Sequence, residues 1–289
     1  MTEPADHSRP IAIPDLMLEP MVRAALAEDL GHWGDITTRT VVPADTRAEA
    51  RIVARDDGVV SGMQVARIAF RLVDSGLDVD TLIPDGARCR KGETLMAIAG
   101  SAASILSAER VALNFAGRLC GIATLTASYV AETRGTRTRI TCTRKTTPGL
   151  RLVEKLAVSH GGGFNHRFGL SDAILIKDNH IAAAGGVRPV LRACKAHASH
   201  MVRVEIEVDL LEQLAEVLDE GGADVVLLDN MDTPTLRAAV ALVGGRLVTE
   251  ASGNMTIARI AEVAATGVDY ISSGALTHSA RTLDLGLDF

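Results

Sequence analysis

The stretch VEIEVDLLEQLAEVLDEGGADVVLLDN, residues 204–230, decides the fold of this chain. It holds a run of branched apolar residues, then a segment with apolar residues at helical spacing, and then a second apolar run. The first run closes near Glu207 and the second at Asp229, so one strand, one helix and two short loops fill the interval. Such a unit is typical of parallel β-strands joined by helices.

The same rhythm extends through the last two thirds of the chain. Short runs rich in branched apolar residues occupy residues 139–143, 173–176, 202–206, 224–228, 247–248 and 269–272, and helical patterns occupy 210–218 and 255–265. Polar residues then recur at steps of about 22 residues along the chain, at Glu207, Asp229, Glu250 and Ser272. The repeat predicts either a parallel barrel or an open doubly wound sheet.

The first third of the chain has a different pattern. Apolar residues at helical spacing predict a helix over residues 16–30, with Asp15 as its N-cap and Gly31 as its stop. Strand and turn patterns follow over residues 51–60 and 83–106. A long, largely apolar helix is predicted to begin at Ser107 and to run to about Glu132. We therefore expect a small α+β domain before the repeating units.

Composition excludes several classes of protein. The net charge of −6 argues against a nucleic-acid-binding protein, and we expect no apolar run as long as a membrane helix. Residues 1–10 lack the apolar core of a signal peptide and are expected to be a frayed tail. The four cysteines form no CxxC pair, so we expect reduced thiols in a cytoplasmic protein.

Polar residues stand where the predicted parallel strands end. The carboxyl ends of barrel strands carry the active site in enzymes of this architecture. The residues at these ends are Arg144, Lys145, Lys177, Glu207, Asp229, Glu250, Ser252, Ser273 and Gly274. Because a charge flanked by buried strand residues needs a partner, we expect these side chains to share one site.

A basic stretch lies next to these strand ends. Residues 134–167 contain eight Lys and Arg residues and only one acid, Glu154, in a chain of net negative charge. Arg suits bidentate capture of carboxylates and phosphates, so the stretch favours an anion site over a solvated basic face. Gly-containing loops that follow late barrel strands are a common phosphate site. Here these loops are residues 252–254 and 273–275, and ordinary helix caps are the alternative.

The two acids of the predicted site allow more than one chemistry. Glu207 and Asp229 suit ribose hydroxyls, a Mg²⁺ ion or a developing cation. A glycosidase pair is a second interpretation. Lys177 could instead form a Schiff base, as in barrel aldolases.

Seven segments together resemble the quinolinate phosphoribosyltransferase family, also called carboxylating nicotinate-nucleotide pyrophosphorylase. They run in order along the chain, and the longest, residues 143–181, opens with TRKTTPG at 143–149 and continues through GGGFNHR at 161–167. The others include EDLGHWGDITT at 28–38, SAERVALNFAGRLCGIATLT at 107–126, VEIEVD at 204–209, LLDNM at 227–231, ASGNMT at 251–256 and GVDYISSGALTHSA at 267–280.

The resemblance implies a fold and a domain division. The expected fold is α/β, of the type II phosphoribosyltransferase kind: an incomplete α/β barrel with an N-terminal α+β sandwich domain. We expect the sandwich domain over residues 1–115, with the tail 276–289 returning to it, and the barrel over residues 116–275. The family also implies a homodimer in which the neighbouring subunit completes each site.

The resemblance further implies a role for each matching residue. Arg110 of the neighbour would reach the quinolinate carboxylates, which Arg144, His166 and Arg167 would also bind. Lys145 and Lys177 would contact this dicarboxylate or the pyrophosphate, and Glu207 and Asp229 would bind the ribose hydroxyls and Mg²⁺. The 5′-phosphate and the rest of the substrate would be held by residues from the loops, namely Thr143, Ser252, Gly253, Asn254, Ser273, Gly274 and Ala275.

The implied reaction joins quinolinate to the ribose of phosphoribosyl pyrophosphate (PRPP). It releases pyrophosphate and carbon dioxide and gives nicotinate mononucleotide in de novo NAD biosynthesis. The alternatives are a related barrel phosphoribosyltransferase, either nicotinate-specific or of the molybdenum-locus type, and the Schiff-base aldolase that uses Lys177.

Overall fold

The computed structural model describes residues 13–289, which form two compact units. Unit 1 contains the chain up to residue 127 together with residues 146–162 and 276–289, and unit 2 contains residues 128–145 and 163–275. The sequence analysis expected a domain boundary at residue 115, and the two units do not follow that boundary. The division into domains stays a prediction. The expectation for residues 1–10 lies outside the described residues.

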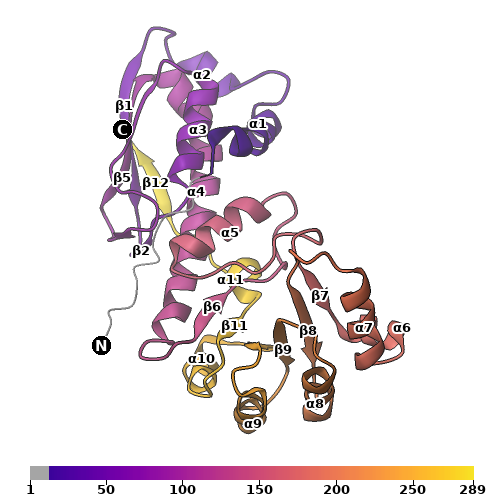
Figure 1. Cartoon of the computed structure of the whole chain (residues 1–289). Helices are drawn as coiled ribbons and strands as arrows, with labels where there is room; N and C mark the ends of the chain where they lie inside the picture. Colours follow the sequence, from indigo (N-terminus) through magenta and orange to yellow (C-terminus); the bar gives the residue numbers. More distant parts are fainter. Residues whose placement is uncertain (1–12) are drawn as a thin grey trace. The chain divides into compact units, whose positions relative to one another are not determined.

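Unit 1 is built on an antiparallel sheet in the strand order β12-β1-β5-β3 (Figure 1). Its strands are β1 (Arg47–Ala54), β3 (Asp78–Thr81), β5 (Thr94–Ser101) and β12 (Leu285–Asp288). Along β1, Ala50, Ile52 and Ala54 are buried, as the two-residue period of a strand dictates. A separate short ladder pairs β2 (Gly58–Val59) with β4 (Arg88–Cys89).

Helices complete unit 1: α1 (Asp15–Leu30), α2 (Ile36–Val41), α3 (Met63–Val73), α5 (Arg151–His160) and most of α4 (Ala102–Ala131). The predicted N-cap of α1 was wrong. Pro14 holds the cap position, and Asp15 lies in the first turn, where its charge favours the helix start. Gly31 ends α1 as predicted.

The long helix α4 also departs from the prediction. It begins at Ala102, directly after β5, so Ser107 lies inside the helix rather than at its start. By length and composition alone α4 could cross a membrane, contrary to our expectation for the chain. However, 67% of its most apolar window is buried inside the protein, as in the core helix of a water-soluble fold.

Unit 2 contains a parallel sheet of six strands in the order β6-β11-β10-β9-β8-β7. The strands are β6 (Arg139–Thr141), β7 (Ile174–Ile176), β8 (Val204–Val208), β9 (Val225–Asp229), β10 (Val248–Ser252) and β11 (Tyr270–Ser272). No ladder joins β6 to β7 among the described residues, so the barrel is incomplete, as expected from the resemblance. On its free side β6 forms one isolated bridge, to Phe164.

Helices lie along the outer side of this sheet (Figure 1). They are α6 (Asp178–Ala184), α7 (Val187–His197), α8 (Leu211–Glu220), α9 (Thr233–Val243) and α10 (Ile257–Ala264). The short helix α11 (Ala275–His278) begins at the last residue of unit 2 and continues into unit 1. In β8, Val204, Ile206 and Val208 are buried on one face of the strand. Glu205 and Glu207 therefore share the opposite face, about 7 Å apart along the strand.

Candidate active site

The carboxyl ends of the unit 2 strands bring predicted site residues together. Lys177 directly follows β7, and its Nζ lies 2.7 Å from Oε2 of Glu207 on β8. Asp229 is the last residue of β9, the next strand in the sheet. Adjacent parallel strands thus deliver one cation and two carboxylates to one edge, which is the arrangement that the sequence repeat predicted.

Burial and several charged neighbours act on the pKa of Asp229. Burial raises the pKa of its carboxyl above the ordinary value, and the nearby charge of Asp209 raises it further. Lys177, a hydrogen bond from Ser252 and Lys145 act in the opposite direction on the same pKa. We refer to Lys145, Lys177, Glu207, Asp229 and Ser252 as the mouth cluster.

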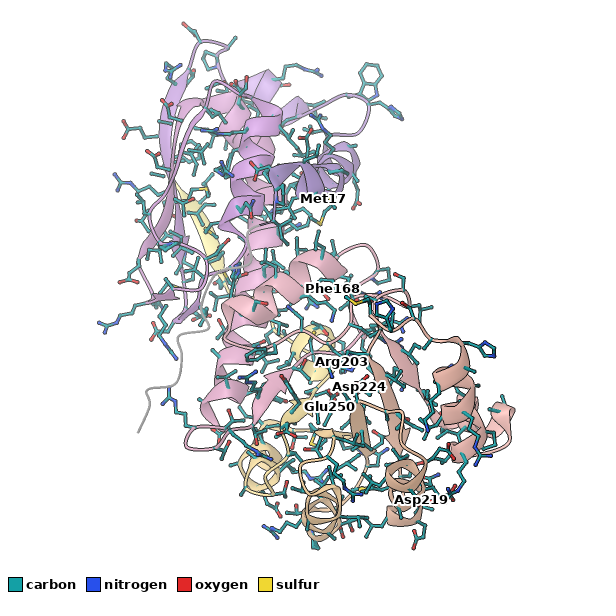
Figure 2. The ribbon with its side chains drawn as sticks, viewed as in Figure 1. Met17, Phe168, Arg203, Asp219, Asp224 and Glu250 are labelled. Atoms are coloured by element: carbon teal, nitrogen blue, oxygen red, sulfur yellow. The ribbon has the colours of Figure 1, made fainter. Side chains whose placement is uncertain are left out.

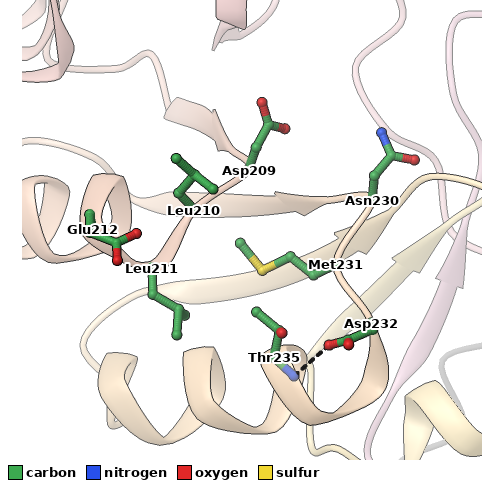
Figure 3. A pocket seen from close by; sticks show the side chains of 8 residues that line it. All are labelled: Asp209, Leu210, Leu211, Glu212, Asn230, Met231, Asp232 and Thr235. Atoms are coloured by element: carbon green, nitrogen blue, oxygen red, sulfur yellow. Dashed lines mark hydrogen bonds between the residues drawn. The ribbon is translucent and has the colours of Figure 1, made fainter.

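An open cavity of about 440 Å³ lies beside the mouth cluster (Figure 3). Asp209 and Asn230, which directly follow β8 and β9, line it together with Met231 and the start of α9. At that start, the Asp232 side chain accepts a hydrogen bond from the Thr235 N–H and caps the helix. The cavity offers room for a polar substrate at the strand ends.

A second group, the interior cluster, contains Glu205 on β8 and Glu250 on β10, together with Arg144, His166 and Arg167, which lie outside the strands. The Nε2 of His166 lies 2.8 Å from Glu205 Oε2 and 3.8 Å from Glu250 Oε1. The Nδ1 of His166 accepts the backbone N–H of Arg167 at 2.8 Å. Both glutamates are buried, with residue exposures of 7% for Glu205 and 5% for Glu250.

The two arginines of the interior cluster influence each other electrostatically. Burial, and then repulsion from Arg144, lowers the pKa of the Arg167 guanidinium, while Glu205 and Asp172 counteract this. The buried Nε atoms of Arg144 and Arg167 have no hydrogen-bond partner among the described residues. Since buried donors are normally satisfied, two such N–H groups on neighbouring cations suit a carboxylate ligand.

A cavity of about 270 Å³ reaches the interior cluster and is lined by His166, Arg167, Glu205 and Glu250 among others. Its wall also includes the first residues of β7, β9, β10 and β11, so it extends toward the amino-terminal ends of the strands. Figure 2 labels Arg203, just before β8, and Glu250, which both line this cavity.

Two glycine loops follow β10 and β11, which pair in parallel and therefore end side by side. Gly253 has a φ of +89°, and a Cβ there would lie 2.2 Å from Asn230 Oδ1, so only glycine fits. The Ser273 N–H donates to Thr141 O, and its hydroxyl donates to Met255 O. The loops 252–254 and 273–275 are thus fixed next to the mouth cluster, and their phosphate role stays a prediction.

Two further predicted residues, Thr143 and Arg110, belong to neither cluster. Thr143 Oγ1 accepts the backbone N–H of Lys145 at 3.0 Å, so Thr143 orders the segment that carries the lysine. Arg110 belongs to α4 in unit 1, with a side chain 64% exposed and 3.9 Å from Glu109. Its predicted role across a dimer stays a prediction.

Comparison with known proteins gives two family matches that together span nearly the whole chain. Residues 35–120 match the quinolinate phosphoribosyl transferase N-terminal domain, and residues 122–288 match its C-terminal domain.

The chain belongs to the quinolinate phosphoribosyltransferase family.

Individual relatives agree with this family assignment. A quinolinate phosphoribosyltransferase [decarboxylating] 2b, mitochondrial, from Nicotiana tabacum is 42% identical, over 96% of this chain and 84% of that protein. A probable nicotinate-nucleotide pyrophosphorylase [carboxylating] from Bacillus subtilis is 42% identical, over 94% and 93%. The solved nicotinate-nucleotide pyrophosphorylase from Francisella tularensis is 37% identical, with a TM-score of 0.90 and coverage of 96% and 97%.

This member of the quinolinate phosphoribosyltransferase family is a carboxylating nicotinate-nucleotide pyrophosphorylase, which acts in de novo NAD biosynthesis. The function inferred from the sequence motifs is confirmed, and the aldolase, glycosidase and sister-transferase alternatives fall away. The geometry agrees for Lys177, since an ammonium group paired with Glu207 is a poor Schiff-base nucleophile.

Sequence reasoning left Glu205 out of this quinolinate phosphoribosyltransferase site and gave Glu250 no specific role in it. Glu250 was noted only as a strand-end acid, and Glu205 was not noted at all. The signal was present in VEIEVD, because Glu205 stands two residues before Glu207 and so shares its face. The partner of Glu205, His166, lies 39 residues away along the chain, and only the fold brings them together.

Proposed function

We propose that the interior cluster binds quinolinate and that the mouth cluster binds PRPP. The observation that carries this proposal is the common face of β8, from which Glu205 joins the interior cluster and Glu207 joins the mouth cluster. Successive side chains on one face of a strand lie about 7 Å apart. A pyridine ring bound at the interior cluster would therefore lie next to a ribose bound at the mouth cluster.

Quinolinate is a dianion with two adjacent carboxylates. The unsatisfied Nε atoms of Arg144 and Arg167 support its placement in the interior cluster. A planar guanidinium can hold a carboxylate through two parallel hydrogen bonds. Arg110 of a second subunit is the proposed third arginine, in keeping with its exposed side chain.

PRPP is proposed to lie across the mouth. Lys145 and Lys177 would stabilise the pyrophosphate as it leaves, and Glu207 and Asp229 would accept hydrogen bonds from the ribose hydroxyls. The loops 252–254 and 273–275, together with Thr143, would hold the 5′-phosphate end of the substrate. Burial, and then the charge of Asp209, raises the pKa of Asp229, and a bound cation would offset both effects.

Mg²⁺ is the proposed cation, held by Glu207 and Asp229 and in part through PRPP. Paired carboxylate oxygens and phosphate oxygens are the ligands that Mg²⁺ prefers. When bound, the ion would neutralise charge on the pyrophosphate.

The chain's own residues then position charge rather than form a covalent intermediate. The bond between C1 of the ribose and the pyrophosphate oxygen breaks, and the electron pair leaves with pyrophosphate toward Lys145 and Lys177. The carboxylates of Glu207 and Asp229 stabilise the positive sugar ring. The pyridine nitrogen bonds to C1, and the resulting pyridinium accepts the electron pair released when C2 loses its carboxylate as carbon dioxide. A proton then replaces that carboxylate at C2.

We further propose a cytoplasmic homodimer with shared sites. Several large apolar side chains of unit 1 are exposed, as at an interface between copies: Leu16, Met17, Trp33, Ile36 and Val41. The four cysteines are free, and burial raises the pKa of the Cys120 thiol to about 12, which suits a reducing compartment.

Two experiments test these proposals. Carbon dioxide release from carboxyl-labelled quinolinate should require both PRPP and Mg²⁺, and turnover of nicotinate alone would overturn the dicarboxylate site. For the dimer, Arg110→Ala and Lys145→Ala proteins should each be inactive alone. After subunit exchange they should recover about one quarter of wild-type activity, because half of the dimers hold one intact site. No recovery would count against shared sites.

A further inference from the structure

His166 has both ring nitrogens engaged by the protein. Its Nδ1 accepts the backbone N–H of Arg167 at 2.8 Å, and its Nε2 faces Glu205 Oε2 at 2.8 Å. The imidazole is only 13% exposed at its side chain. Two short contacts to its own chain hold the ring in one orientation.

The donors and acceptors fix the state of this ring. A backbone N–H can only donate, so Nδ1 carries no proton. Oε2 of Glu205 accepts, so Nε2 carries the proton of a neutral imidazole. Glu250 Oε1 lies 3.8 Å from the same Nε2, so a second buried carboxylate flanks the N–H.

We propose that His166 is a positioning residue for Arg167, held as the neutral Nε2–H tautomer between the Arg167 backbone and the Glu205–Glu250 pair. The inference rests on the proposed quinolinate site and adds a positioning role to the one that the resemblance gave to His166. Through its Nδ1 the ring fixes the backbone from which the Arg167 side chain extends. The Arg167 guanidinium is fixed at its other end, where Nη1 donates to Ala173 O at 2.9 Å. The buried Arg167 Nε, which no described residue pairs, is thereby held in place for a ligand.

A metal ion is the other occupant that one histidine and two buried glutamates suggest, because their ligand atoms lie within 4.8 Å of one another. Two features favour a proton over a divalent cation. The contact of 2.8 Å between Nε2 and Oε2 is an ordinary hydrogen-bond distance. In addition, Arg167, which feels the charges of both Arg144 and Glu205, already supplies positive charge beside the carboxylates.

Nitrogen-15 NMR of protein with labelled histidine tests the tautomer in the intact enzyme. The His166 signals, assigned by their loss in His166→Asn, should show an unprotonated Nδ1 and a protonated Nε2. Saturating quinolinate should leave this pattern unchanged. A protonated Nδ1, an imidazolium formed on quinolinate binding, or a displacement of the Nε2 proton by Zn²⁺ or Mg²⁺ would overturn the proposal. Because the measurement needs no turnover, its failure is distinct from failure of the catalytic assignment.

Variants separate positioning from substrate contact. His166→Ala should raise the KM for quinolinate on the order of 10-fold to 100-fold, through misplacement of Arg167, with the KM for PRPP unchanged. His166→Asn keeps an acceptor near Nδ1 and should recover most of this loss, whereas His166→Gln, whose amide reaches the Nε2 position, should recover less. Equal KM values for the three variants would refute the role of Nδ1.

A second site covers the case in which His166 variants fold poorly. Glu205→Gln keeps an acceptor for the Nε2–H and should preserve the tautomer, whereas Glu205→Ala should lose it. His197→Asn, an exposed histidine on α7, is the matched control and should behave as wild type. Loss of the tautomer in Glu205→Gln as well would contradict a hydrogen-bonded clamp.

Discussion

The mouth and interior clusters use similar side chains in opposite ways. At the mouth, the Lys177 side chain is 48% exposed, and its charge is already compensated by Glu207. In the interior, Arg144 and Arg167 keep buried N–H donors that no described residue satisfies. The charge of Lys177 is therefore paired without a ligand, whereas the buried N–H donors of the interior cluster need a ligand to complete their hydrogen bonds.

This contrast indicates how the two substrates are selected. Exposed charges gain little from one another and are screened by salt, so the mouth mainly has to orient a highly charged substrate. Buried donors cost free energy until they are paired, so the interior discriminates strongly for a ligand with carboxylates in the right places. We therefore expect changes in the interior cluster to act on quinolinate binding and changes at the mouth to act on turnover.

The largest effect should follow from Arg144→Ala. The change leaves a substrate carboxylate without its bidentate partner in a buried site, a loss of roughly 2–4 kcal/mol in binding. Steady-state kinetics should show this as a higher KM for quinolinate, with the KM for PRPP unaffected. Arg188→Ala, which removes an exposed arginine paired with Asp219 on the outside of the sheet, is the matched control. An unchanged KM in Arg144→Ala would break the contrast between the clusters.

A mouth variant should instead lower kcat. Glu207→Gln keeps the shape of the side chain but removes the charge that faces the sugar and Lys177. We expect a fall in kcat on the order of 10²-fold, with the KM for quinolinate within about twofold of wild type. If quinolinate binding weakened as strongly as in Arg144→Ala, the two clusters would not be functionally distinct.

A smaller effect should come from Asp209→Asn. Asp209 helps to raise the pKa of Asp229, so removing its charge lowers that pKa and keeps Asp229 ionised at lower pH. The acid limb of the kcat profile should move down by about 0.5 pH unit. Asp219→Asn, on the outer helix α8 (Figure 2), should leave the limb in place. An acid limb that stayed in place would show that Asp229 does not set it.

The smallest effect should be a gain in stability from Asp229→Asn. Since the pKa of Asp229 is raised in the folded state, the native protein binds more protons than the unfolded chain between the ordinary and the raised value. Stability therefore falls as pH rises through this window, and the penalty persists at neutral pH. The neutral amide removes it, so Tm at pH 7 should rise by about 2 °C or less, while activity is lost. Equal Tm values at pH 7 would show that solvent screens the penalty.

The contrast between the clusters also explains what the sequence revealed. Lys177, Glu207 and Asp229 were predictable because each stands at the end of an apolar strand, where a charged residue needs a partner. Glu205 was not, because a glutamate inside the strand pattern has meaning only through His166, a partner from another segment. The strands of unit 2 were predictable from their branched residues, since parallel strands buried on both faces leave a local apolar signature.

Helix starts were less predictable than strands. The start of α4 was misplaced by five residues, because β5 passes into α4 without an intervening loop. Ser101, whose Oγ accepts the Ser104 N–H at 3.3 Å, is both the last residue of the strand and the cap of the helix. At α1, an acid in the first turn has the same composition signal as an acid in the cap position, and only the backbone conformation distinguishes them.

The path of the chain has a consequence for engineering. Unit 1 is assembled from three separate stretches of sequence, with α5 and β12 contributed from after the point where the two family matches meet. A gene cut at that junction would deprive the amino-terminal fragment of β12, one of the two strands that pair with β1. No single truncation yields either unit whole, so fragment complementation or circular permutation, rather than simple deletion, is the route to studying one unit without the other.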